Sequence, residues 1–351
     1  MGAVLGIDIG GTKISLCAAG ASGQVLARTR IETRSSDGAS VVLDRLSSAA
    51  VELVQHVLQA HGSEVRGVGV VTPGVVEADR VQLAPNNQGW DEVALTATVS
   101  ERLGLGAVEA DNDAKAATAA EARWGALAGV TDGILLNLGT GISAGAVVGG
   151  QLLRGAHGAA LEIAYQVPTA GAVHGFRDGH APLEERFSGA GVGAWASALL
   201  GRPTGADEVF AAMRSAGRGG GGVGAGQDAA RLAALGADAL ELAARTVANL
   251  AIALDPEVVA VSGGMLRSAD VITPALAAAL SRLVPFPPRL VTAHFDDHAP
   301  LAGACLVAYR AAGVPSPAWL DLGPVAAAAP TRSGVQTARP GEQAERSEGV
   351  P

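Results

Sequence analysis

The amino-acid sequence predicts an α/β fold made of two related halves, and three observations lead to this interpretation. Strand-like and helix-like segments alternate along the chain, which favours α/β layers over a helical bundle or a β-sandwich. A strand, a glycine-containing turn and a second strand occur once in each half, over residues 4–18 and 134–148. The length of 351 residues corresponds to about two domains, or to one large domain that is split.

The first half begins with a hairpin. Residues 4–9 form a β-rich run that ends at the turn Gly10-Gly11-Thr12-Lys13, and residues 14–18 resume the alternation of a strand. Because side chains alternate across a strand, we expect Ile7 and Asp8 on opposite faces. The elements that follow are a helix over 42–58, a buried strand over 68–71, a strand over 107–110 and an alanine-rich helix from Asp113 to about Ala128.

The second half repeats this pattern. Residues 134–138 form a strand that ends at Gly139-Thr140-Gly141, and residues 142–148 form its hairpin partner. A long helical pattern over 227–254 precedes a buried strand over 258–262, which runs into Gly263-Gly264. Two further segments indicate irregular structure: a flexible glycine loop over 217–222, and a solvated tail over 314–351 that is rich in Pro, Ala, Ser and charge.

Composition excludes several classes of protein. Lys and Arg total 25 against 34 Asp and Glu, and the net charge of −9 has the wrong sign for a protein that binds nucleic acid through its phosphates. No apolar run approaches the roughly 18 residues of a membrane span. Cys17 and Cys305 both lie in apolar stretches, so we expect neither disulfides nor a thiolate metal site. The N-terminus lacks the basic start and long apolar core of a signal peptide, which favours the cytoplasm.

The glycine turns are candidate phosphate sites. Gly10, Gly11, Thr12 and Lys13 offer unobstructed backbone amides, a hydroxyl and an ammonium, although an ordinary glycine hairpin has the same pattern. The pairing of this turn with Gly139, Thr140 and Gly141 in the other half would clamp a di- or triphosphate from two sides. Gly263 and Gly264 follow a buried strand and suit a base or ribose packed on bare backbone, or a plain strand-to-helix turn.

Taken together, these motifs resemble the repressor, open reading frame and kinase (ROK) family of sugar kinases. The resemblance covers residues 4 to 311. It depends on Asp8 to Lys13, Pro73-Gly74, Asn112-Asp113-Ala114, Glu121, Leu138 to Gly141, Arg154 to Glu162, Leu183-Glu184 with Ser188-Gly189, and Asp255-Pro256-Glu257 leading to Gly263-Gly264.

The resemblance implies an actin-like ATPase fold, which is ribonuclease H-like, with two lobes and a cleft between them. The expected lobes are residues 1–113, completed by about 299–313, and residues 114–298. Residues 314–351 are then a disordered tail.

The resemblance also implies roles for single residues. Asp113 would be the general base, because helix N-terminal amides keep a carboxylate ionised; without the family it would be a simple N-cap. Asp8 would orient the Mg²⁺ of ATP, usually through water. The glycine turns and Lys13 would contact the nucleotide. The sugar-binding residues would be Asn87, Asn112, Glu162, Tyr165 and Glu184.

One part of the chain departs from the family pattern. Family members commonly have a histidine where this chain has Tyr165, and three cysteines before the residue here numbered Glu184, all binding a structural zinc. Residues 173–183 contain His174 and His180 but no cysteine, so we expect no zinc site. Lys115 stands where an asparagine is common.

We therefore expect an ATP-dependent hexose kinase that forms glucose 6-phosphate. The alternatives are a kinase for mannose, fructose, N-acetylmannosamine or N-acetylglucosamine, the use of polyphosphate as donor, or a sugar-binding regulator that has lost turnover. The family also contains repressors with an N-terminal winged helix, but the first motif begins at Asp8, which favours a kinase. The expected partners are a small sugar and a second copy of the chain, without nucleic acid or membrane.

Overall fold

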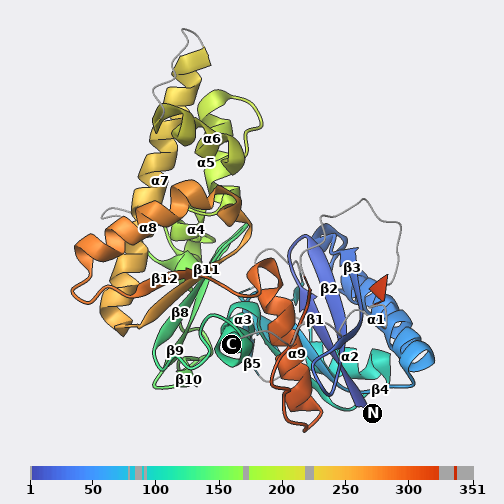
Figure 1. Ribbon diagram of the computed structural model, residues 1–351. Coiled ribbons are helices and arrows are strands. Elements are labelled where there is room, and N and C mark those ends of the chain that lie inside the picture. The colour runs from blue at the N-terminus through green and yellow to red at the C-terminus, as the bar shows by residue number, and fades with distance from the viewer. Residues whose placement is uncertain are drawn as a thin grey trace, which may run out of the picture. The chain divides into compact units, whose positions relative to one another are not determined.

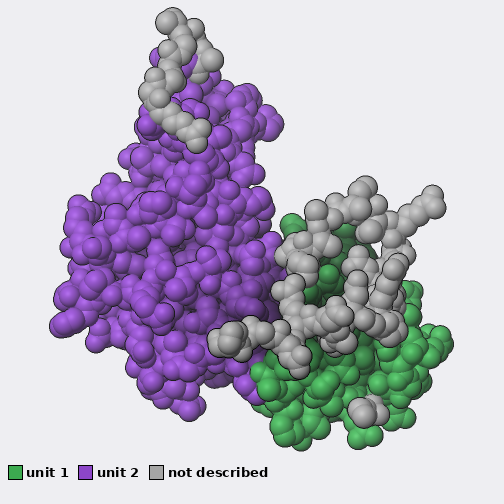
Figure 2. All heavy atoms as spheres, in the orientation of Figure 1, with its two compact units in different colours: residues 1–113, 301–351 green, residues 114–300 purple. Residues whose placement is uncertain are grey.

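The structure is a computed structural model that describes residues 2–77, 80–83, 89–90, 93–168, 174–217, 225–323 and 336–337. The chain forms two compact units (Figure 2). Unit 1 consists of residues 1–113 and 301–351, and unit 2 consists of residues 114–300.

Unit 1 contains a mixed six-stranded sheet in the order β13-β3-β2-β1-β4-β7 (Figure 1). The predicted hairpin is confirmed: β1 pairs antiparallel with β2, and β1, β4 and β7 run parallel. The strand β3 was not expected from the sequence. The strand bounds are β1 (Gly2–Ile9), β2 (Lys13–Gly20), β3 (Val25–Glu32), β4 (Glu64–Thr72), β7 (Val108–Asn112) and β13 (Gln336–Thr337). A separate pair consists of β5 (Val75–Glu77) and β6 (Arg80–Gln82).

Helices cover both faces of the unit 1 sheet. The apolar side of α1 (Ala39–His61) and residues of α2 (Leu95–Leu103) pack with Ile7 and Ile9 in one hydrophobic core. The helix α9 (Ala299–Ala311) packs on the other face, where Gly6 and Gly69 leave room for its backbone. A Cβ atom at Gly6 would lie 2.7 Å from the backbone nitrogen of Cys305, so these glycines permit the close approach of helix and sheet. Asp8 lies on this second face, as predicted.

Unit 2 contains a five-stranded sheet in the order β10-β9-β8-β11-β12. The second predicted hairpin is confirmed by the antiparallel pairing of β8 with β9, and β8, β11 and β12 run parallel. The strand bounds are β8 (Gly133–Leu138), β9 (Ile142–Val148), β10 (Gln151–Leu152), β11 (Val258–Ser262) and β12 (Arg289–Thr292). Besides α3 (Asp113–Trp124), the helices of this unit are α4 (Pro182–Arg186), α5 (Gly189–Leu200), α6 (Ala206–Gly217), α7 (Ala225–Leu254) and α8 (Ala269–Leu283).

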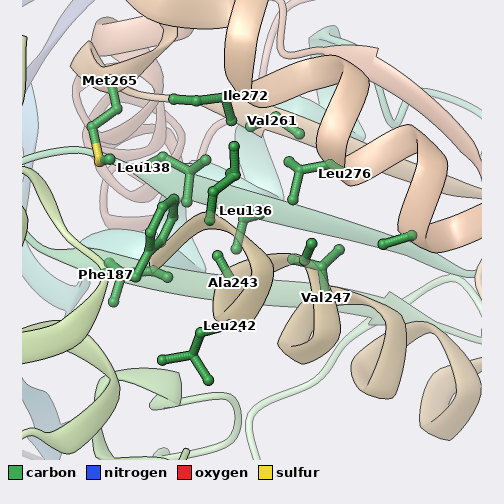
Figure 3. Packing of buried hydrophobic residues seen from close by; sticks show 14 of the residues in the cluster. Leu136, Leu138, Phe187, Leu242, Ala243, Val247, Val261, Met265, Ile272 and Leu276 are labelled. Carbon is green, nitrogen blue, oxygen red and sulfur yellow. The ribbon is translucent and has the colours of Figure 1, made fainter. Parts of the chain in front are cut away.

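The unit 2 core lies between its sheet and the long helices (Figure 3). Leu136 and Leu138 of β8 point toward Val247 of α7 and Ile272 of α8. The helix α3 packs on the opposite face, where a Cβ atom at Gly145 would collide with the Thr118 hydroxyl. Among the described helices, none combines the length and the apolar character that a membrane span requires.

A buried carboxylate connects α3 to the backbone of residues 294–295. Glu121 has no exposed surface and accepts backbone hydrogen bonds from Ala126 (2.7 Å), His294 (3.1 Å) and Phe295 (2.8 Å). Its charge is therefore satisfied by N–H groups of two segments that are far apart in sequence. The motif residue Glu121 thus holds α3 in place.

The prediction that the tail is disordered from residue 314 is wrong for residues 314–323. Leu320 and Leu322 are buried in unit 1, and the guanidinium of Arg28 donates a hydrogen bond of 2.6 Å to the carbonyl of Leu322. Two leucines in an otherwise proline- and alanine-rich stretch supply enough apolar surface to dock it. Further on, β13 pairs antiparallel with β3. The rest of the tail, and residues 218–224 of the predicted glycine loop, lie outside the described residues.

Candidate functional site

Asp8 lies near the carboxyl end of β1 and only 7% of its surface is exposed. Burial and, to a smaller extent, the charge of Asp113 raise the pKa of its carboxyl from 3.8 to about 7, against the charges of Lys13 and Arg30, which lower it. The contribution of Arg30 follows from register, because Asp8 pairs with Ser15 and Ser15 pairs with Arg30 across three adjacent strands. The missed strand β3 therefore brings an unpredicted cation to the site.

Asp113 lies where β7 ends and α3 begins, at the same edge of the sheet as Asp8. This edge carries the carboxyl ends of the parallel strands β1, β4 and β7, where side chains from consecutive crossovers meet. The preceding residue, Asn112, is buried and its side-chain amide donates a hydrogen bond of 2.7 Å to the carbonyl of Gly74. That bond orients the Asn112 amide beside Asp113.

Backbone and side-chain hydrogen bonds fix the conformation of the first glycine turn. The amide of Gly10 donates a hydrogen bond to the carbonyl of Lys13 (2.9 Å). Thr33 is fully buried; its hydroxyl donates to the Gly10 carbonyl (2.6 Å) and its amide donates to the Thr12 carbonyl (3.0 Å). Gly11 and Thr12 remain exposed at the tip. Thr33, which no motif indicated, therefore fixes the shape in which the turn presents its tip to a ligand.

The second glycine turn is fixed in a similar way within unit 2. The amide of Gly139 donates to the carbonyl of Gly141 (2.9 Å), while the first amides of α5 donate to the turn, from Gly189 to the Gly139 carbonyl (2.9 Å) and from Ala190 to the Thr140 carbonyl (3.0 Å). A Cβ atom at Gly141 would collide with the Glu184 carboxylate. Glycine at 141 thus leaves room for the carboxylate of a residue that is itself a predicted site residue.

Three of the predicted sugar-binding residues gather in unit 2. Burial raises the pKa of Glu184, and the charges of Glu185 and Glu162 raise it further, against a lowering hydrogen bond of 3.0 Å from the Ile142 amide. Burial also raises the pKa of Tyr165, with additional contributions from the charges of Glu162 and Glu184. The Tyr165 hydroxyl therefore lies in the field of both carboxylates.

Glu162 has a partner that the sequence analysis did not identify. The ammonium of Lys115, the third residue of α3, lies 3.2 Å from Oε1 of Glu162. The Lys115 side chain is 1% exposed and that of Glu162 is 23% exposed. A signal was present, because Lys115 replaces a common asparagine, but nothing in the sequence linked it to a residue 47 positions away.

Gly263 is required by packing as well as by any ligand. Its φ of 99° lies in the region that favours glycine, and a Cβ atom there would collide with the carbonyl of Leu138. Gly264 then begins a short 3-10 helix, so the turn matches the plain strand-to-helix alternative. The Asp296 carboxylate accepts a hydrogen bond from the Gly263 backbone, which lowers a pKa that burial and Asp297 raise. Asp296 was not predicted.

Two places in the chain carry side chains that can bind metals. Among the residues that the structure describes, no three His, Cys, Asp or Glu side chains are grouped so that they could share a metal ion. His174 and His180 have ring centroids 5.3 Å apart, and Nδ1 of His180 lies 2.9 Å from Glu185. The second place is Asp8. Its buried carboxylate lies near the carboxylate of Asp113, which suits Mg²⁺, a metal that keeps waters and substrate phosphates as its other ligands. Asn87 lies outside the described residues.

Comparison with known proteins gives consistent results. The sequence profile of the ROK family matches residues 4–311. An N-acetylmannosamine kinase from Escherichia coli O157:H7 is 30% identical over 316 residues, which cover 87% of this chain and 97% of the relative. A glucokinase from Thermotoga maritima is 27% identical over 282 residues, or 77% and 84% of the two chains.

Solved structures agree with the sequence relatives. The ROK family glucokinase from Streptomyces griseus, in complex with glucose and AMPPNP, matches with a TM-score of 0.66 and 27% identity, over 88% of this chain and all of the other (100%). The predicted α/β, actin-like ATPase fold is therefore confirmed.

Proposed function

Because the chain belongs to the ROK family, we propose that it is a sugar kinase that transfers the γ-phosphoryl group of Mg²⁺-ATP to a hydroxyl of a hexose. Glucose, phosphorylated at its 6-hydroxyl, is the first candidate substrate. N-acetylmannosamine is the second, because the kinase for that sugar aligns with 87% of this chain at 30% identity. A cytoplasmic enzyme would find both ATP and these sugars.

The observation that carries this proposal is the placement of two carboxylates at one sheet edge. Asp8 is close enough to Asp113 for the charge of one to raise the pKa of the other. Asp113 lies at the start of α3, and the N-terminal amides of this helix favour its ionised form and leave it able to accept a proton. This arrangement suits a base and a metal-orienting acid working together.

In the proposed reaction, Asp113 accepts the proton of the sugar hydroxyl as its oxygen attacks the γ-phosphorus. The bond from that phosphorus to the bridging oxygen breaks, so that the sugar phosphate and ADP are formed. Mg²⁺, when bound, neutralises charge on the phosphates. The remaining residues orient the substrates. Asp8 would hold the metal, and the sugar is bound by Glu162, Tyr165, Glu184, Asn112 and Asn87.

The glycine turns supply backbone amides for the nucleotide in this proposal. Gly10, Gly11, Thr12 and Lys13 contact phosphates, and so do Gly139, Thr140 and Gly141. Gly263 and Gly264 contact the nucleoside. Thr33 and the start of α5, which hold the two turns in shape, reduce the ordering that nucleotide binding has to impose.

The test is an ADP-release assay with Mg²⁺-ATP across hexoses and N-acetylhexosamines. The wild-type protein is compared with Asp113→Asn and with Asp207→Asn, a control that changes an exposed aspartate in the first turn of α6. One sugar should stimulate turnover, Asp113→Asn should lower kcat by about 10²- to 10⁴-fold, and Asp207→Asn should leave it unchanged.

Two outcomes would contradict the proposal. Turnover of Asp113→Asn within tenfold of wild type would remove Asp113 as the base. If no sugar stimulates ADP release while ATP or a sugar still raises the melting temperature, the protein is a binding regulator rather than a kinase.

A further inference from the structure

The buried ion pair between Lys115 and Glu162 joins the helix of the proposed base to the proposed sugar site. Lys115 is one of the largest fully buried side chains of the described chain, and its ammonium lies 3.2 Å from Oε1 of Glu162. A buried ammonium is strongly destabilising unless it is paired, so the position of Glu162 is coupled to that of Lys115.

The helix geometry sends Lys115 away from Asp113. Successive residues of an α-helix are about 100° apart, so two positions along α3 the side chain points to the far side of the helix. Two contacts C-terminal to Lys115 hold the helix in place. Thr118 packs against Gly145 of β9, and Glu121 binds three backbone amides. Lys115 is therefore a rigid anchor rather than a mobile surface lysine.

Glu162 lies in a segment that needs such an anchor. The residue before it, Leu161, has a φ of 60°, a left-handed conformation that is unfavourable for leucine. The Glu162 amide donates a long hydrogen bond of 3.4 Å to the Ala159 carbonyl, and the Glu162 carbonyl accepts one of 3.2 Å from the Tyr165 amide. These contacts leave the direction of the Glu162 carboxylate to its side-chain partner.

The charges around the site support the same role. Glu162 and Glu184 both raise the pKa of Tyr165, and Glu162 also raises the pKa of Glu184, so two carboxylates share one partly buried region. The ammonium of Lys115 offsets one of these charges. It contacts Oε1 and leaves 23% of the Glu162 side chain exposed, so the same carboxylate can accept a hydroxyl.

We infer that Lys115 is a positioning residue that aims the Glu162 carboxylate at the sugar, so that one helix sets both the base at its first residue and the sugar-binding acid. This inference rests on the proposed function. It concerns sugar binding, since the ammonium of Lys115 contacts a proposed sugar-binding carboxylate. Loss of Lys115 should therefore change the KM for sugar and spare the KM for ATP.

The experiment compares Lys115→Met, Glu162→Gln and the double variant with wild type in steady-state kinetics. Lys115→Met should raise the KM for sugar by tenfold or more and change the KM for ATP by less than twofold. The double variant should have the sugar KM of Glu162→Gln alone, because the effect of Lys115 passes through Glu162. It also removes both charges, so it provides a folded protein if Lys115→Met alone does not fold.

A control separates positioning from stability. Arg214→Met removes an ion pair of 2.9 Å with Asp270 elsewhere in unit 2. Arg214→Met should leave the sugar KM unchanged even if it lowers the melting temperature. Lys115→Met would behave in the same way if the role of Lys115 were merely structural.

The outcomes distinguish this inference from the proposed function. A turnover-competent wild type whose Lys115→Met variant keeps its sugar KM overturns the inference alone. So does a Lys115→Met effect that multiplies fully on the Glu162→Gln background. If wild type neither turns over nor gains thermal stability with any sugar, both the function and the inference fail.

Discussion

Replacing Asp8 with asparagine should stabilise the ligand-free protein, and it should do so more at pH 8 than at pH 5. Burial and the charge of Asp113 raise the pKa of Asp8 to about 7 in the native state, whereas an unfolded aspartate has a pKa near 3.9. The native state therefore holds the proton more tightly than the unfolded state. The stability that this gives is fully present below about pH 4 and is lost as the pH rises through 7.

The magnitude follows from the two pKa values. The interval between them corresponds to about 4 kcal/mol, and about 2–3 kcal/mol of that is lost between pH 5 and pH 8. Asp8 is 7% exposed, so solvent screens little of this effect. An asparagine does not titrate, so the free energy of unfolding of Asp8→Asn minus that of wild type should grow by this amount over the same interval.

Urea unfolding at pH 5, 6, 7 and 8, without Mg²⁺ or nucleotide, measures this difference. Asp113→Asn is the companion variant, because it removes the second cause of the raised pKa of Asp8. The free energy of unfolding of this variant should therefore fall less between pH 5 and pH 8 than that of wild type. The reasoning is refuted if the Asp8→Asn difference is the same at pH 5 and pH 8 to within about 0.5 kcal/mol.

Three further predictions concern stability. Glu121→Gln replaces one of two accepting oxygens with an NH₂ group, so at least one of the three backbone amides faces a donor, and thermal unfolding should show a loss of about 3 kcal/mol; a loss below about 1 kcal/mol would mean that those bonds are not essential. Gly263→Ala forces an unfavourable φ and a collision with the Leu138 carbonyl, so we expect a loss of about 3 kcal/mol by urea unfolding, and a neutral result would contradict the packing. Tyr309→Phe removes a buried hydrogen bond of 2.6 Å to the Gly20 carbonyl and should cost about 1 kcal/mol in the same assay, whereas a stabilised variant would argue against that bond.

Local patterns predicted the two hairpins well. The alternation in residues 4–18 and 134–148 depends on neighbours in sequence, and the structure has antiparallel strands at both places. The same alternation placed Asp8 opposite Ile7. The strand β3 was missed because its residues face both core and solvent irregularly, and its pairing with β2 is a tertiary fact.

The candidate site divides in the same way. The motifs identified Asp8, Asp113 and the two glycine turns by type and spacing. They did not identify Thr33, Arg30 or Asp296, because each acts through a partner that is distant in sequence.

The sequence by itself therefore determined the local structure, which comprises the strands, the helices and the turns between them, and it identified the family from its motifs. Only the tertiary structure decided how charges are shared. Burial of Asp8 beside Asp113 and of Lys115 against Glu162 depends on strands and helices brought together from distant parts of the chain. Desolvation and Coulomb energy depend on distance and burial in space, and neither is encoded in the spacing of residues along the chain.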